Sequence, residues 1–224
     1  MGEAVIKAIL FDFDGLILDT ETTEFIAFQE ICRQYDYEMP LDVWSQWTGA
    51  TDSVQRACHH LEQAVGAPLD HDELRSRHGE VFRGMIATAE LLPGVVEKLE
   101  EGKRRGLRIG LATSAHYDWA VGYVKKYGLL DYFDCIRTKE DVIRSKPDPQ
   151  IYREALAGLS IEPREAIAFE DSLFGLQAAK AAGVYCVVVP NALTQAFTFE
   201  QADLRLQSLL EMDLEQIIAR VTRH

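Results

Sequence analysis

The pair Asp12 and Asp14 follows an apolar stretch near the start of the chain, residues 5–10, which only Lys7 interrupts. Such a stretch is typical of a short buried strand. Side chains two residues apart in a strand point the same way, so both carboxylates project together, and Gly15 then allows the backbone to turn. Because adjacent carboxylates repel each other, a compensating cation is indicated, and Mg²⁺ prefers oxygen ligands of this kind.

Further polar residues stand where later predicted strands end. They are Thr113 and Ser114, then Glu170 and Asp171, with Lys146 in a loop stiffened by two prolines. One carboxylate can attack phosphorus, a second can move protons and a third can hold Mg²⁺, while hydroxyl and ammonium groups bind phosphoryl oxygens. These residue types predict phosphoryl transfer through an aspartyl-phosphate.

Alternating helix and strand patterns after Pro93-Gly94 must position these residues. Hydrophobic periodicity predicts strands at 107–112, 133–136, 166–169 and 184–189, helices at 95–104, 116–127, 149–157 and 173–182, and one or two helices within 204–220. This alternation is typical of a parallel sheet with helices on both faces. In such sheets the functional groups gather beyond the carboxyl ends of the strands.

The block before this alternation has a helical pattern and contains no convincing strand. After a short apolar hairpin or flap at 16–20, it predicts three helices around 25–32, 54–65 and 74–85, the second with Asp52 as a candidate N-cap. We therefore expect a Rossmann-like three-layer α/β fold. Residues 1–19 and 93–224 would form the catalytic parallel-sheet core, and residues 20–92 a small inserted α-helical cap domain.

Composition limits the partners of this chain. Its 224 residues are 47% hydrophobic, enough for a buried core, and its formal net charge is −13, which disfavours nucleic acid and anionic membranes as partners. No apolar run is long enough to cross a bilayer and no signal-peptide pattern is present, so we expect a cytoplasmic protein. We also expect a monomer or weak dimer. The four scattered cysteines, Cys32, Cys58, Cys135 and Cys186, are expected to be reduced thiols.

The sequence resembles the haloacid dehalogenase-like superfamily over nearly its whole length. Four segments carry the resemblance, each at a predicted strand end or its loop: residues 11–21 (FDFDGLILDTE), 111–114 (LATS), 146–149 (KPDP) and 169–172 (FEDS). Each segment alone is a weak signal, but their order and the helical insertion directly after the first make the resemblance specific.

The resemblance implies a role for each matching residue. Asp12 would be the nucleophile and a metal ligand, and Asp14 the general acid/base whose backbone carbonyl also binds Mg²⁺. Asp171 would bind the metal directly, and Glu170 directly or through water. The phosphate would be held by Gly15, Thr113, Ser114 and Lys146. The inserted helices would match the cap that closes over the site and selects the leaving group.

Details of the motifs favour one reaction within the superfamily. The dehalogenase branch lacks an acidic residue where Asp14 stands, so we expect Mg²⁺-dependent hydrolysis of a small phosphorylated metabolite, a sugar phosphate or nucleotide-type monophosphate. The alternative is a phosphosugar mutase of the beta-phosphoglucomutase type. That mutase carries a His where this chain has Glu24, and an Arg three residues after a glycine that Gly49 matches, where this chain has Asp52. Both departures disfavour the mutase.

A third alternative is a non-catalytic receiver module, which also uses Asp, Thr/Ser and Lys with Mg²⁺, but receivers are far shorter and have no cap. Some residues have two interpretations. The residues Trp44, Trp47, Thr48 and Gly49 could belong to the core of the cap or contact the substrate. The basic stretch Arg75, Arg77, His78 and Arg83 could be a solvated helix face or could bind a second anionic group. His116 could be a residue of a first helical turn or a substrate contact.

Overall fold

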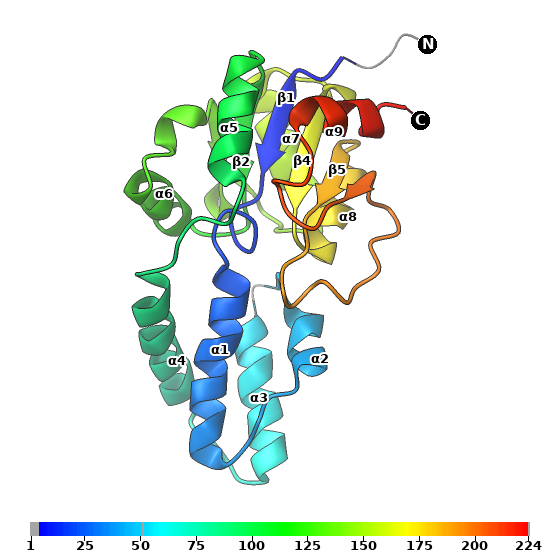
Figure 1. The fold of residues 1–224 in the computed structure, drawn as a ribbon. Helices are drawn as coiled ribbons and strands as arrows, with labels where there is room; N and C mark the ends of the chain where they lie inside the picture. Colours follow the sequence, from blue (N-terminus) through cyan, green and yellow to red (C-terminus); the bar gives the residue numbers. More distant parts are fainter. Residues whose placement is uncertain (1–4, 51, 224) are drawn as a thin grey trace.

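The strand before the aspartate pair, β1 (Ala8–Phe11), lies inside a six-stranded parallel sheet. The computed structural model describes residues 5–50 and 52–223. The sheet order is β3-β2-β1-β4-β5-β6, with β2 (Arg108–Ala112), β3 (Cys135–Arg137), β4 (Ala166–Glu170), β5 (Tyr185–Val188) and β6 (Leu204–Arg205). Beyond the carboxyl end of β1 lies a separate group of helices (Figure 1).

The register of the central strands brings the candidate site residues level with one another. Phe11, the last residue of β1, is paired with Leu111 of β2 on one side and Phe169 of β4 on the other. The chain therefore leaves β1, β2 and β4 at the same end of the sheet, within one residue of these positions. The backbone N–H of Asp12 still donates to the Phe169 carbonyl at 3.1 Å, so the chain is held in place up to the first aspartate.

Helices cover both faces of the sheet, and successive strand residues point to opposite faces, so each strand contributes to both layers. On one face, Ile9 and Phe11 join the buried cluster that includes α5 (Val95–Arg104), α6 (Tyr117–Lys126) and α9 (Leu214–Val221). On the other face, Ala8 and Leu10 join the cluster that includes α7 (Gln150–Leu159) and α8 (Leu173–Ala181). The predicted three-layer α/β fold is confirmed.

Residues 20–92, called the helical segment below, contain four α-helices where three were expected, and two short 3-10 helices, among the described residues. Most members of a third buried cluster lie in this segment, with Leu193 of the core joining them. The helices are α1 (Thr20–Cys32), α2 (Leu41–Trp44), α3 (Ser53–Val65) and α4 (His71–Ile86). Phe28, Trp44, Leu61 and Leu74 belong to the cluster, which is separate from the two clusters of the sheet. The division into core and cap at residues 19 and 93 stays a prediction, and residues 1–4, 51 and 224 of those ranges lie outside the described residues.

Three local expectations differ from the structure. Residues 204–205 form strand β6 rather than helix, because the chain bonds to β5: the Asp203 and Leu206 N–H groups donate to carbonyls of β5 at 2.9 Å. Only Leu214–Val221 of that stretch is α-helical. Asp52 stands at the N-cap position of α3, as predicted, but its side chain makes no capping hydrogen bond and its carboxylate pairs with Arg56 at 2.9 Å. Strand β1 begins at Ala8 rather than Val5.

The apolar turn after the aspartate pair is buried and tied to the return connection. Leu18 forms isolated bridges to Asp14 and to Leu91, and the Leu92 N–H donates to the Ile17 carbonyl at 2.9 Å. The two chain crossings between the sheet and the helical segment are therefore fastened to each other beside the aspartates. Within the described residues, every helix is too short or too polar to cross a lipid bilayer.

Candidate active site

Lys146 joins two carboxylates that come from neighbouring strands. Its Nζ lies 2.9 Å from Asp12 Oδ1 and 2.7 Å from Glu170 Oε1, and only 4% of the lysine side chain is exposed. Burial by itself would lower the pKa of Lys146, but the charges of Asp12 and Glu170 outweigh it and raise that pKa. The side chain is therefore an ammonium group throughout the physiological pH range.

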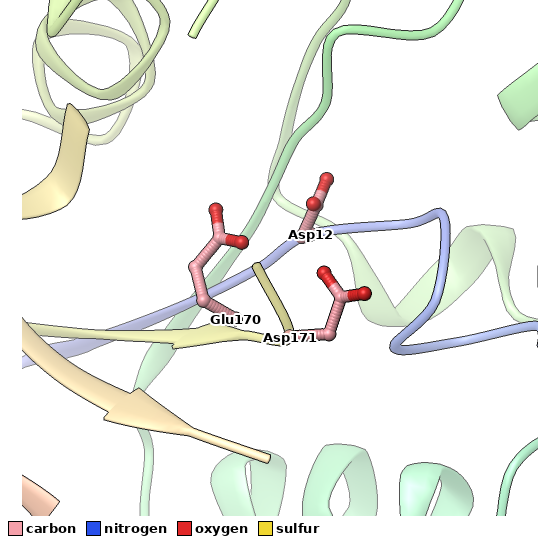
Figure 2. A group of neighbouring side chains, drawn as sticks. All are labelled: Asp12, Glu170 and Asp171. Atoms are coloured by element: carbon pink, nitrogen blue, oxygen red, sulfur yellow. The ribbon is translucent and has the colours of Figure 1, made fainter. Parts of the chain in front are cut away.

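Three carboxylates form a cluster that fits a divalent cation (Figure 2). Asp12, Glu170 and Asp171 are buried, and each offers an oxygen within 4.8 Å of the others. Burial, followed by the charge of Asp12, raises the pKa of Glu170 to about 7 and raises that of Asp171 as well. Gathering these negative charges is costly, and an all-oxygen donor set of this kind suits Mg²⁺, which would offset the cost.

Glu170 is buried behind the cavity lining and is held by Tyr152, which the sequence did not point to, and by Ser172 of the fourth motif. It accepts hydrogen bonds from Tyr152 Oη and, at 3.5 Å, from Ser172 Oγ. Gly175 of α8 gives it room, because a Cβ at that position would lie 1.8 Å from Glu170 Oε2. A glycine inside a helix lowers helix stability, and this is the one local signal that could have revealed the close approach.

Asp171 is fixed from two sides. Asn191 Nδ2 donates to its Oδ2 at 2.7 Å, and Gly15, with φ of +75°, is so near that a Cβ there would lie 2.0 Å from the same oxygen. The Gly15 N–H donates to Thr20 Oγ1 at 3.1 Å and to the Leu18 carbonyl at 2.8 Å. Gly15 therefore shapes the turn and makes room for Asp171, and its N–H donates to Thr20 and Leu18 in this structure; its phosphate-binding role stays a prediction.

Asp14 lines the same cavity as Asp12 and Asp171 and has a different environment. Trp119 Nε1 of α6 donates to Asp14 Oδ1 at 3.2 Å. Burial, followed by the charge of Asp12, raises the pKa of Asp14 to about 6. A carboxyl group with this pKa can both give and take a proton near neutral pH, which is what a general acid/base needs.

The hydroxyl residues after β2 lie beside the carboxylates. Thr113 is buried, and its Oγ1 accepts the Ala115 N–H at 3.0 Å. Ser114 Oγ is buried and has no hydrogen-bond partner among the described residues. Because an unpaired buried hydroxyl is unfavourable, Ser114 has a free donor for an anion in the cavity.

A cavity of about 700 Å³ lies between the sheet and the helical segment. Six of the eight predicted site residues line it: Asp12, Asp14, Thr113, Ser114, Lys146 and Asp171. Glu170 and Gly15 lie behind the lining. The opposite wall comes from the helical segment and includes Glu21, Glu24, Asp52, Arg75 and Phe82.

The wall from the helical segment is rich in carboxylates. Burial, followed by the charge of Asp14, raises the pKa of Glu24 to about 7, and burial, followed by Glu24, raises that of Glu21. Glu24 accepts a hydrogen bond from Ser53 Oγ at 3.3 Å. The sequence suggested Glu24 only as a departure from the mutase pattern, and Glu21 only as the last residue of the first motif.

The aromatic residues with two interpretations lie away from the cavity. Trp44 is buried in the helical segment against Phe25 and Phe28, and Trp47 packs on Trp44. Of that group, Gly49 lines the cavity, whereas Trp44, Trp47 and Thr48 are not among its lining residues.

The residues of the basic stretch of α4 have different environments: one lines the cavity and one is buried among the helices of the helical segment. Arg75 lines the cavity, while Arg77 and Arg83 do not. His78 is buried, with Nε2 3.1 Å from the Glu24 carbonyl, and burial lowers its pKa. His116 lies at the cavity rim, 2.7 Å from a carboxylate oxygen of Glu140. The four cysteines, expected to be reduced thiols, form no disulfide with one another, and all four are buried.

Comparison with known proteins agrees with this geometry. The family model described as haloacid dehalogenase-like hydrolase matches residues 9–189. A Bacillus subtilis (strain 168) protein called "Putative phosphatase YhcW" is 44% identical over 96% of this chain and 97% of its own. The "Validoxylamine A 7'-phosphate phosphatase" of Streptomyces hygroscopicus subsp. limoneus is 30% identical over 92% of this chain and 95% of its own.

A solved structure extends the comparison to three dimensions. A crystal structure of a CbbY variant from Rhodobacter sphaeroides, in complex with xylulose-(1,5)bisphosphate, is 32% identical, covers 94% of this chain and 98% of its own, and has a TM-score of 0.75. The expectation of a haloacid dehalogenase-like hydrolase is confirmed, and the phosphatase names agree with the expected enzyme class. By its sequence, its fold and its similarity to these proteins along nearly its whole length, this chain belongs to the haloacid dehalogenase-like hydrolase family.

Proposed function

We propose that this enzyme is a Mg²⁺-dependent phosphatase that hydrolyses a small phosphorylated metabolite through an aspartyl-phosphate. One observation carries the proposal: Asp12 lies 2.9 Å from the buried Lys146 ammonium and faces a cavity that Asp14, Thr113 and Ser114 also line. A nucleophile, a cation, hydroxyl groups and a second carboxylate of different pKa are thus gathered around one space.

In the first half of the reaction, Asp12 attacks the phosphorus atom and the bond to the leaving oxygen breaks. Lys146, Thr113 and Ser114 bind the phosphoryl oxygens, and protonated Asp14 gives its proton to the leaving oxygen. In the second half, Asp14 takes a proton from water, whose oxygen attacks phosphorus and releases Asp12 and inorganic phosphate. Asp12, Asp171 and Glu170, with the backbone carbonyl of Asp14, would hold Mg²⁺, which would supply the positive charge that lets an anionic nucleophile approach a phosphate dianion.

The helical segment serves as a cap in this proposal. It supplies the wall opposite Asp12, and its two connections to the core are fastened to each other near the aspartates. A cap in this place excludes bulk water while the aspartyl-phosphate exists and contacts the leaving group.

The substrate of this proposal has a single phosphate group. The wall from the helical segment carries Glu24, which is ionised above about pH 7, and Asp52, whose charge Arg56 compensates in part. Negative charge on this wall disfavours a second phosphate. A polyhydroxylated or amine-bearing leaving group suits this wall better. In this respect the chain differs from the related CbbY, whose structure holds a bisphosphate.

Glu24 and Asp52 also favour hydrolysis over the mutase reaction. A mutase must bind a bisphosphate intermediate in both orientations, which needs a positive group on the cap; Arg75 lies on this wall, but Asp72 already compensates part of its charge. Isomerisation of a hexose 1-phosphate without phosphate release would reverse this preference. A monomer or weak dimer in the cytoplasm, without nucleic acid or membrane partners, remains a prediction from the sequence.

The proposal is tested by measuring phosphate release from 4-nitrophenyl phosphate with Mg²⁺ and with EDTA. Activity should require Mg²⁺ and should be lost in Asp12→Asn, which keeps the size of the side chain and removes the nucleophile. Asp131→Asn, at an exposed aspartate of the core, is the matched control and should retain activity. Full activity of Asp12→Asn would rule out the aspartyl-phosphate mechanism.

A further inference from the structure

Trp119 lies between the proposed acid/base and the helical segment. Its indole Nε1 donates to Asp14 Oδ1 at 3.2 Å. Its ring stacks on Phe82 of α4, with ring centroids 5.5 Å apart and an interplanar angle of 29°. One side chain of the core therefore contacts Asp14 through its edge and the helical segment through its face.

Neighbouring rings hold both members of this stack. Tyr123, one turn further along α6, meets the Trp119 ring edge-on at 4.8 Å. Phe82 stacks in turn on His78 at 6.1 Å, and His78 Nε2 lies 3.1 Å from the Glu24 carbonyl in α1. Phe82 therefore packs on a residue of α4 that also contacts α1, and the indole of Trp119 packs on Phe82.

We propose that Trp119 is a positioning residue that aims the Asp14 carboxyl group at the leaving oxygen, and that Phe82 holds the indole in the orientation needed to do so. This inference rests on the proposed function, in which Asp14 protonates the leaving group. It adds a residue from outside the four motifs and gives the helical segment a part in the proton transfer.

The chemistry of the indole suits this role. An indole N–H is a donor only and does not exchange its proton with the substrate, so Trp119 orients the carboxyl group without competing as an acid. It binds Oδ1, so Oδ2 is the oxygen that would give the proton. The Thr20 hydroxyl also hydrogen-bonds to the Asp14 carboxyl group, and substitution of Trp119 leaves that hydroxyl group in place. A proton donor must lie within hydrogen-bond reach of the leaving oxygen, and a freely rotating carboxyl group spends less time there.

The test compares kcat/KM for 4-nitrophenyl phosphate and phenyl phosphate, two substrates of nearly equal shape. Nitrophenolate leaves readily without a proton, whereas phenolate depends on the acid. Because kcat/KM covers only steps up to the first irreversible one, it reports formation of the aspartyl-phosphate. The variants are Trp119→Phe, which keeps a ring on Phe82 but loses the N–H, and Phe82→Leu, which keeps the N–H but loses the stack. Trp47→Phe, the same substitution away from the cavity, is the matched control.

We expect Trp119→Phe to lose roughly tenfold more kcat/KM on phenyl phosphate than on 4-nitrophenyl phosphate. Phe82→Leu should show the same difference to a smaller extent, and Trp47→Phe none. Circular dichroism melting curves establish that the variants are folded. Equal losses on both substrates in Trp119→Phe would show that the residue is merely structural. A Phe82→Leu variant with wild-type selectivity would overturn the link to the helical segment. Failure of the wild type to release phosphate from either ester would instead refute the proposed function itself.

Discussion

Lys146 Nζ lies 2.9 Å from Asp12 Oδ1. Asp12 is one of three carboxylates that form the candidate metal cluster, together with Glu170 and Asp171. The ammonium group also contacts Glu170 at 2.7 Å, so it compensates two buried carboxylates at once. Removing one partner of a buried ion pair leaves an uncompensated charge, which is far more costly than losing a pair on the surface.

Lys146→Met should therefore destabilise the protein by about 3–5 kcal/mol and abolish phosphate release. Lys7→Met is the control, because Lys7 pairs with Glu165 at 2.6 Å while 53% of its side chain is exposed, and its loss should cost about 1 kcal/mol or less. Urea unfolding curves measure both. Similar unfolding midpoints for the two variants would mean that the Lys146 contacts add little to stability.

Gly175→Ala should displace Glu170, because the added Cβ would lie 1.8 Å from Glu170 Oε2. We expect lower stability and at least tenfold lower activity, as the Lys146 contact moves with the carboxylate. Gly122→Ala in α6 is the matched control: nothing lies within 4 Å of its added Cβ, so it should stabilise the helix by up to about 1 kcal/mol. Wild-type activity in Gly175→Ala would show that Glu170 need not stay in this place.

The fold and the main site residues could be predicted because their signals are local. Three of the four motifs stand at the end of a short apolar stretch, and parallel pairing then brings the strand ends level, as the pairing of Phe11 with Phe169 shows. The motif with Lys146 lies in a loop and was indicated by its two prolines. The sequence therefore indicated Asp12, Asp14 and Asp171 together without knowledge of any long-range contact. Strand β6 had no such signal, because two residues at a sheet edge are too short to show periodicity.

The supporting residues could not be predicted, since their partners lie far away in the sequence. Trp119, Tyr152 and Asn191 contact Asp14, Glu170 and Asp171 through single hydrogen bonds across the fold. Tryptophan and tyrosine are usually core residues, so residue type alone gave no reason to place them at the site. Gly175 could have been singled out from the sequence, because glycine inside a helix lowers helix stability and often marks a close approach of another group.

Mg²⁺ should stabilise the protein more at pH 8 than at pH 5. The pKa of Glu170 is raised to about 7, first by burial and then by Asp12, so the stability from its protonated form is present below about pH 4.5 and is lost as the pH rises through 7. At pH 8 the ionised cluster needs the cation, and a concentration 100-fold above Kd would add about 2.7 kcal/mol. Thermal melting in Mg²⁺ and in EDTA at both pH values measures the difference.

The control for the Mg²⁺ effect is a change in one carboxylate of the cluster. Asp171→Asn should lose most of the Mg²⁺-dependent shift at pH 8, whereas Asp131→Asn on the surface should keep it. A shift of equal size at both pH values, or one that persists in Asp171→Asn, would place the cation elsewhere.

The wall from the helical segment should select against substrates that carry a second phosphate group. A hexose bisphosphate should have at least tenfold lower kcat/KM than the matching hexose monophosphate, because its distal phosphate meets Glu24 and Asp52; tenfold corresponds to about 1.4 kcal/mol. The double variant Glu24→Gln/Asp52→Asn should narrow this gap. Added salt should narrow it as well, since these charges face a water-filled cavity.

Arg75 provides the opposing test, because it is a cation on the same wall. It pairs with Asp72 on α4, so part of its charge is already compensated. If the bisphosphate proved the better substrate and Arg75→Ala removed that preference, Arg75 would be the binding group for a second phosphate. If instead Arg75→Ala leaves the monophosphate preference unchanged while the carboxylate double variant reduces it, the acidic residues of the wall set the selectivity, and the search for the natural substrate narrows to monophosphates with uncharged or cationic leaving groups.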